Sequence, residues 1–167
     1  MVDTDPILVL TTGGTIDKQY FDALSKYQIT DSIVTRLLEV ARVRHPHLVE
    51  EVLRKDSIDI TDEDRAQIVE HVRRAKHSRV VITHGTDTMT VTATALASIA
   101  GKTIVLTGAL APARFSESDA AFNLGMAFAT AQTAAQGVYI AINGCVFRGD
   151  EVVKNHELGW FTRKQEK

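Results

Sequence analysis

Short runs of branched apolar residues recur along the chain without the polar and apolar alternation of a half-exposed strand. The clearest runs are Ile7–Leu10, Arg79–Thr83, Thr103–Thr107 and Val138–Ile142. A glycine follows each run within three residues, as expected where a buried strand breaks into a loop. Leu48–Leu53 is a further strand candidate. Such runs are typical of parallel strands that are covered on both faces.

Segments with helical spacing separate these strands. The first follows Asp31, which we expect to cap it, and its apolar residues share one face: Ile33, Val34, Leu37, Leu38 and Ala41. Further helices are predicted after Thr61, over residues 87–100, and from Ser118 or Asp119 to near Gly137. Residues 145–153 resemble two short strands around residues 148–150.

The regular alternation of strands and helices predicts an α/β fold. We expect a three-layer sandwich with a mainly parallel, flavodoxin-like sheet and helices on both faces. The chain has 167 residues and no repeat or change of composition, so a single domain over residues 1–167 is predicted.

Charge and composition exclude several classes of function. The 19 basic and 21 acidic residues give a net charge of -2, so neither nucleic acid nor a membrane surface is an expected partner. Cys145 is the single cysteine, which excludes an internal disulfide. Residues 1–10 resemble neither a signal peptide nor a membrane span, and we expect a cytoplasmic protein. His45 and His47 lack a third ligand at suitable spacing, so no metal or other cofactor is expected.

Polar residues gather where two of the predicted strands end. The first strand leads into Thr12–Thr15, and the strand that ends at Thr83 leads into His84–Thr88. In open α/β sheets the carboxyl ends of the strands face the ligand. Each feature also has an ordinary explanation: Gly13 and Gly14 could form a tight turn, Asp87 could cap a helix, and Lys154 could be a solvated charge.

A hydroxyl nucleophile needs an activating neighbour, and the oxyanion that it creates needs fixed donors. Thr15 follows two glycines, so its hydroxyl can reach a cleft. Backbone amides around Gly14 and Thr86 could then serve as oxyanion donors.

These residues resemble the bacterial type L-asparaginase family, which carries T-G-G-T-I and H-G-T-D-T segments. Both segments occur here, at residues 12–16 and 84–88. Further matches are Thr107-Gly108-Ala109, Ser118-Asp119-Ala120, Asp56-Ser57 and Val153-Lys154. The resemblance covers nearly the whole chain but only the amino-terminal domain of the family, and we expect no carboxyl-terminal domain after Lys167.

The resemblance implies an amidohydrolase that converts L-asparagine to L-aspartate and ammonia, with possible minor glutaminase activity. Thr15 would form the acyl-enzyme, and Lys154 would polarise Thr86. Substrate would contact Gly14, Ser57, Thr86 and Asp87, with Ser57 at the α-carboxylate and Asp87 at the ammonium group. Tyr27 is the chosen partner of the nucleophile, Tyr20 is the competing choice, and His84 would be structural.

The shared active sites of the family imply a homodimer or homotetramer here. Two alternatives differ in function class. One is an ammonia-releasing subunit of an amidotransferase complex, and the other is a catalytically silent module that binds an amino acid.

Overall fold

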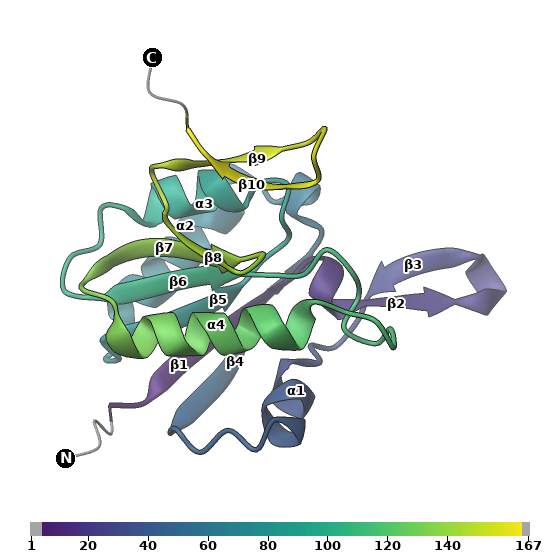
Figure 1. Ribbon diagram of the computed structural model, residues 1–167, viewed down its shortest axis with the longest axis horizontal. Coiled ribbons are helices and arrows are strands. Elements are labelled where there is room, and N and C mark those ends of the chain that lie inside the picture. Colours follow the sequence, from purple (N-terminus) through teal and green to yellow (C-terminus); the bar gives the residue numbers. More distant parts are fainter. Residues whose placement is uncertain (1–4, 165–167) are drawn as a thin grey trace.

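A computed structural model describes residues 5–164, and within them the main sheet has six strands. Their order is β4-β1-β5-β6-β7-β8 (Figure 1). The strands are β1 (Ile7–Gly13), β4 (His47–Lys55), β5 (Arg79–Thr83), β6 (Thr103–Thr107), β7 (Gly137–Ile142) and β8 (Cys145–Arg148). All neighbouring pairs are parallel except β7 and β8. The first five strands follow the flavodoxin-like order, which confirms the predicted fold class.

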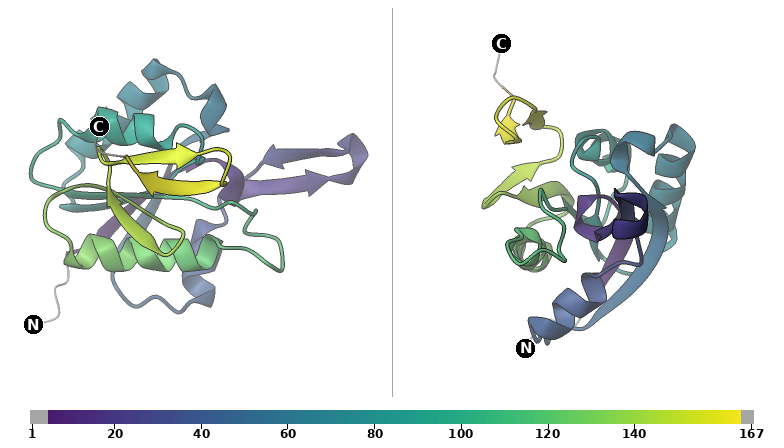
Figure 2. Two further views of the ribbon diagram at one scale, coloured as in Figure 1. Left: turned by 45° about the horizontal axis from the view of Figure 1, so that its top comes forward. Right: turned by 90° about the vertical axis from the view of Figure 1, so that its right-hand side faces the viewer.

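Helices cover both faces of this sheet, as Figures 1 and 2 show. On one face, α2 (Asp62–Arg74) and α3 (Met89–Leu96) pack on even-numbered strand residues such as Leu10 and Ile82. On the other face, α1 (Val34–Val40) and α4 (Ala120–Thr133) pack on odd-numbered residues such as Val9 and Val81. Strand side chains alternate between the faces, so each apolar run fills two cores. The predicted three-layer sandwich is therefore confirmed.

Two hairpins lie outside the main sheet. The strands β2 (Lys18–Phe21) and β3 (Lys26–Ile29) are antiparallel and project away from the body of the molecule (Figure 1). The strands β9 (Val152–Asn155) and β10 (Trp160–Arg163) form the second hairpin, and β9 contacts α3 (Figure 2). Three short 3-10 turns complete the described elements: Thr15–Asp17, Asp22–Leu24 and Ser57–Asp59.

The structure confirms the two short strands predicted over residues 145–153 and shows with which strand each one pairs. Both strands exist, but β8 joins the main sheet whereas β9 pairs with β10. The alternation in each strand does not reveal its partner, because pairing depends on where the chain turns in space.

Helix starts differ from the sequence prediction in one instructive case. Asp31 does not cap α1. Instead, the Ser32 hydroxyl accepts a hydrogen bond from the Val34 amide, and the buried carboxylate of Asp17 accepts one from the Ile33 amide. The distant carboxylate was available only through the tertiary fold.

The helix predicted over residues 87–100 is shorter and begins at Met89, and no side chain caps it. The predicted cap at Thr61 is confirmed, since Thr61 and Asp64 satisfy each other's backbone amides in a capping box. Among the described helices, none is long and apolar enough to cross a membrane.

Candidate active site

The glycines of the two predicted loops lie in direct contact. The strands β1 and β5 are parallel and in register from Ile7↔Arg79 to Thr11↔Thr83. The loops that follow the two strands therefore begin at the same edge of the sheet. A Cβ atom on Gly14 would lie 2.5 Å from the Gly85 nitrogen, and Gly14 has a φ of 85°. Both the contact and the positive φ exclude a side chain at this position. The structure therefore places the segments that contain Thr15 and Thr86 next to each other.

The segment after β4 joins the same group. Ser57 follows this strand in a 3-10 turn, and a Cβ atom on Gly85 would lie 2.6 Å from the Ser57 Oγ. The Thr88 hydroxyl donates a 2.7 Å hydrogen bond to the Ser57 carbonyl. The Ser57 hydroxyl itself is fully buried and has no hydrogen-bond partner among residues 5–164. A buried donor without a partner is costly, so this hydroxyl is available for a bound group.

Lys154 contacts the polar side chains of the loop over residues 84–88. Its ammonium group, carried by β9, donates a 2.8 Å hydrogen bond to the Thr86 hydroxyl and lies 2.5 Å from the Asp87 carboxylate. The Lys154 side chain is only 13% exposed, so the charge is largely removed from water. Neither ordinary explanation fits: Asp87 caps no helix through its side chain, and Lys154 is not a solvated charge.

His84 fixes the loop that carries Thr86. Its ring is fully buried, with Nδ1 2.7 Å from the Gly85 carbonyl and Nε2 2.8 Å from the Thr92 hydroxyl. Burial, helped by the positive charge of Arg65 and opposed by the hydrogen bond to the Gly85 carbonyl, lowers the pKa of His84 to about 4. We assign the proton to Nδ1, because a carbonyl can only accept. These contacts agree with the structural role that the sequence analysis gave to His84.

Thr15 lies at the start of a 3-10 turn and is partly exposed. Within the described residues its hydroxyl makes no hydrogen bond. The Gly14 amide donates a 3.0 Å hydrogen bond to the Lys55 carbonyl, so this amide is not free as an oxyanion donor. That corrects one expectation from the sequence, which could not reveal where β4 ends. An oxyanion donor must come from another group of these loops.

Tyr20 and Tyr27 lie opposite each other on the β2–β3 hairpin, with ring centroids 5.2 Å apart. The Tyr27 ring also lies 6.0 Å from that of Phe115, in the segment after β6. The two tyrosines are 46% and 52% exposed, and neither hydroxyl makes a hydrogen bond within the described part of the chain. The structure thus gives Tyr27 a contact toward the body of the molecule but no bond to Thr15.

Sequence reasoning missed the residues that hold the neighbouring loop after β6. The buried side chain of Asn123 donates hydrogen bonds to the Gly108 carbonyl and to the Asp119 carboxylate. The same carboxylate accepts from the amides of Leu110 and Ala111. An amide side chain on the mainly apolar face of a predicted helix was the signal in the sequence.

A second missed contact joins the first loop to Ser57. Lys18 forms a 2.7 Å ion pair with Asp56, the residue before Ser57. Burial raises the pKa of Asp56, but the hydrogen bond and charge of Lys18, together with the backbone amides of Ile58 and Ser57, outweigh this effect and lower the pKa overall. Asp17, beside Lys18, is buried, and desolvation raises the pKa of its carboxyl.

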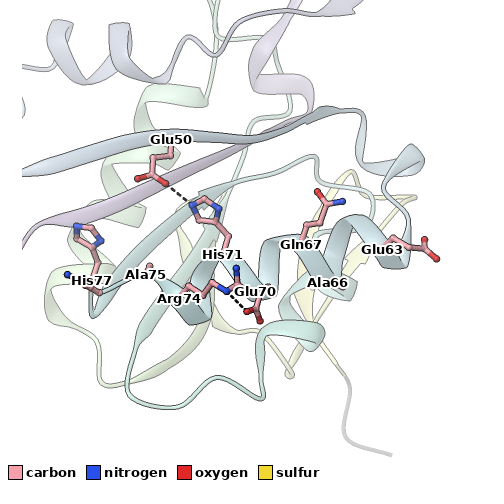
Figure 3. A pocket seen from close by; sticks show the side chains of 10 residues that line it. Glu50, Glu63, Ala66, Gln67, Glu70, His71, Arg74, Ala75 and His77 are labelled. Atoms are coloured by element: carbon pink, nitrogen blue, oxygen red, sulfur yellow. Dashed lines mark hydrogen bonds and ion pairs between the residues drawn. The ribbon is translucent and has the colours of Figure 1, made fainter.

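A hollow of about 870 Å³ lies elsewhere, beside α2 and β4 (Figure 3). Glu50 and His71 both line it, and the His71 Nε2 lies 2.7 Å from the Glu50 carboxylate. It includes none of the predicted site residues. Within residues 5–164 no group of three His, Cys, Asp or Glu side chains could hold a metal ion, and His45 contacts the Asp5 carbonyl.

Known proteins share this arrangement of strands and loops. A family model described as Asparaginase, N-terminal matches residues 6–162. The chain belongs to the asparaginase family. L-asparaginase of Thermococcus kodakarensis is 34% identical over 163 residues, which cover 92% of this chain and 48% of that protein. The chain therefore spans about half the length of the curated asparaginases that it matches.

Two further relatives bear on the alternatives. One of the subunits of the Glutamyl-tRNA(Gln) amidotransferase of Archaeoglobus fulgidus is 32% identical over 167 residues, which cover 90% of this chain and 39% of that protein. A solved structure named Probable Cytoplasmic L-asparaginase, from Campylobacter jejuni, superposes with a TM-score of 0.83 and 30% identity. That superposition covers 95% of this chain and 53% of the Campylobacter jejuni chain.

Proposed function

We propose that this chain is an amidohydrolase that converts L-asparagine and water to L-aspartate and ammonia. The observation that carries the proposal is the Lys154–Thr86–Asp87 group, placed by Gly14 and Gly85 beside the segment that begins with Thr15. Membership of the asparaginase family supports the amide substrate.

In the proposed reaction the Thr15 hydroxyl oxygen attacks the side-chain amide carbon. The C–N bond then breaks, ammonia leaves with the proton from the hydroxyl, and an ester on Thr15 remains. Water hydrolyses this ester, releasing the β-carboxylate of L-aspartate and restoring Thr15. Because Lys154 donates to the Thr86 oxygen, the Thr86 hydrogen is free to point at a reacting group.

The remaining site residues would bind the ends of the substrate. The buried Ser57 hydroxyl suits the α-carboxylate, since a bound carboxylate would supply its missing partner. The carboxylate of Asp87, 41% exposed, suits the α-ammonium group. Gly14 would contribute only backbone atoms to the substrate contact, because Gly85 fills the space that a side chain would need. Tyr27 would assist Thr15 from the projecting hairpin, which must then move toward the loops.

Residues 1–167 would act as one catalytic domain in a cytoplasmic homodimer or homotetramer. The name of the Campylobacter jejuni relative supports the cytoplasmic location. Minor activity on L-glutamine would follow from the similar chemistry, because one methylene is discriminated by only about 1–3 kcal/mol.

The test is ammonia release by the purified chain alone. We expect equal amounts of ammonia and L-aspartate from L-asparagine, and slower release from L-glutamine. Activity that appears only with an amidotransferase partner would favour the alternative of an amidotransferase component, for which the Archaeoglobus fulgidus match is the supporting observation. Saturable binding of L-asparagine without any hydrolysis would favour the silent module.

A further inference from the structure

A second hollow, of about 840 Å³, lies between α2, α3 and the start of the β9 strand. Its walls are mainly aliphatic, with Val69 from α2, Val91 from α3 and Val153 from β9. Val91 is 48% exposed and Val153 is 40% exposed, so both present apolar surface to the hollow. An aliphatic ligand would remove this surface from water, and the absence of aromatic side chains among the lining residues favours an alkyl chain over a flat ring.

The charges around the hollow leave one positive group only weakly compensated. Arg65 lines the hollow, its side chain is only 11% exposed, and its Nε is buried without a hydrogen-bond partner within residues 5–164. The Arg65 Nη1 forms a 3.1 Å ion pair with the carboxylate of Asp62, whose side chain is 95% exposed. Such an exposed carboxylate screens a buried guanidinium only weakly.

The other charged groups of the lining strengthen this asymmetry. Glu70 is already shared by Arg73 at 2.8 Å and Arg74 at 2.5 Å. Lys164 donates to the carbonyl of Asp150, a neutral partner that leaves its charge in place. The hollow therefore combines an aliphatic floor with an excess of positive charge, which matches a carboxylate head on an alkyl chain.

The same walls lead to the candidate active site. Val153 lines the hollow, and the ammonium group of the next residue, Lys154, reaches the Thr86 hydroxyl. Thr90 of α3 also lines the hollow, four residues after Thr86. A ligand held between α3 and β9 would thus bridge the strand that carries Lys154 and the helix that follows the Thr86 loop.

We propose that this hollow is a binding site for a small aliphatic carboxylate, and that occupancy fixes the β9 strand so that Lys154 stays on Thr86. The binding stands on the geometry alone, whereas the effect on Lys154 rests on the proposed function. Filling the hollow should therefore raise the rate of ammonia release.

The probe is octanoate, compared with 1-octanol and octylammonium, which share the chain length but differ in head charge. Calorimetric titration should show saturable octanoate binding at least about tenfold tighter than that of either comparison compound. Absence of saturable octanoate binding up to about 10 mM, or equal binding of octylammonium, would overturn the site.

Two variants locate the binding, each with a matched control outside the hollow. Arg65→Gln should weaken octanoate about tenfold, whereas Arg74→Gln, on the same helix, should change it less than about twofold. Because Arg65 is nearly buried, Val91→Glu offers a second test at an exposed position, and Val146→Glu on β8 is its control. Equal effects of a variant and its control would reject this location.

The coupling to Lys154 is tested separately. Saturating octanoate should increase both ammonia release, by about twofold or more, and the hydrogen-exchange protection of β9. If octanoate binds but neither quantity changes, the coupling is wrong and the binding site remains. If the chain releases no ammonia at all, the proposed function fails, while titration and exchange still decide the site and the coupling.

Discussion

The two sides of the candidate active site differ in how firmly they are held. On one side, Thr86 and Asp87 are bonded to Lys154, and the buried ring of His84 fixes the loop from behind. On the other side, the hydroxyls of Thr15 and Tyr27 make no hydrogen bonds within residues 5–164, and Tyr27 is 52% exposed. One side is assembled in advance, and the other remains open.

This difference suggests a division of work between the two sides. A preorganised polar group stabilises charge without having to rearrange during the reaction. A nucleophile at the edge of a projecting hairpin can instead admit substrate before the hairpin closes. Substitutions should therefore separate the sides: those on the open side should affect the rate alone, and those on the fixed side should affect rate and stability together.

The largest effect is expected from Thr15→Ala on the open side. Loss of the nucleophile should lower ammonia release by about 10⁴-fold or more. The free energy of unfolding should stay within about 0.5 kcal/mol, because the hydroxyl has no hydrogen bond to lose. Ammonia assays and urea unfolding measure the two quantities. A rate equal to that of the unsubstituted chain would remove Thr15 from the mechanism.

Lys154→Met on the fixed side should lower the rate by about 10³-fold. It should also lower the free energy of unfolding by about 1 kcal/mol, since Thr86 loses a partner and the ion pair to the partly exposed Asp87 is broken. Lys76→Met, at an exposed lysine, is the control and should change neither quantity.

A double variant tests whether the fixed side acts as a unit. Thr86→Val combined with Lys154→Met should be no slower than the slower single variant. Fully multiplicative losses would show that the two groups act independently.

The titration of His84 should contribute about 2 kcal/mol to the pH dependence of stability between pH 7 and pH 5. Its pKa is about 4 in the folded chain and near 6.5 when unfolded. Within this window the unfolded state binds more protons than the folded state. The contribution of neutral His84 to the free energy of unfolding is therefore complete above the unfolded pKa and falls as the pH drops. His84→Gln should flatten this dependence in urea unfolding at both pH values. His156→Gln, at an exposed histidine, should leave the dependence unchanged, and an unaltered slope in His84→Gln would contradict the assignment.

The smallest effect distinguishes the two tyrosines of the hairpin. Tyr27→Phe should lower the rate of ammonia release about tenfold, whereas Tyr20→Phe should change it less than about twofold. Both variants keep the tilted contact between the two rings, so stability should not separate them. The reverse order of rates would assign the role to Tyr20 instead.

The sequence alone determined the sandwich and the motif loops. Unbroken apolar runs such as Val80–Ile82 require cover on both faces, and the order of strands and helices then restricts the topology. These features are local, so periodicity reveals them. The β2–β3 hairpin was missed because its short polar strands bury little surface and carry no such pattern.

Only the tertiary structure decided which groups meet. The bonds of Lys154 to Thr86 and Asp87 span 68 and 67 residues, the Gly14 amide proved to be occupied by Lys55, and Asp17 replaced Asp31 at the start of α1. Such contacts depend on where each strand ends in space and on which polar groups remain to be satisfied there. Neighbouring residues along the chain do not encode those positions, because many arrangements of loops are compatible with the same local pattern.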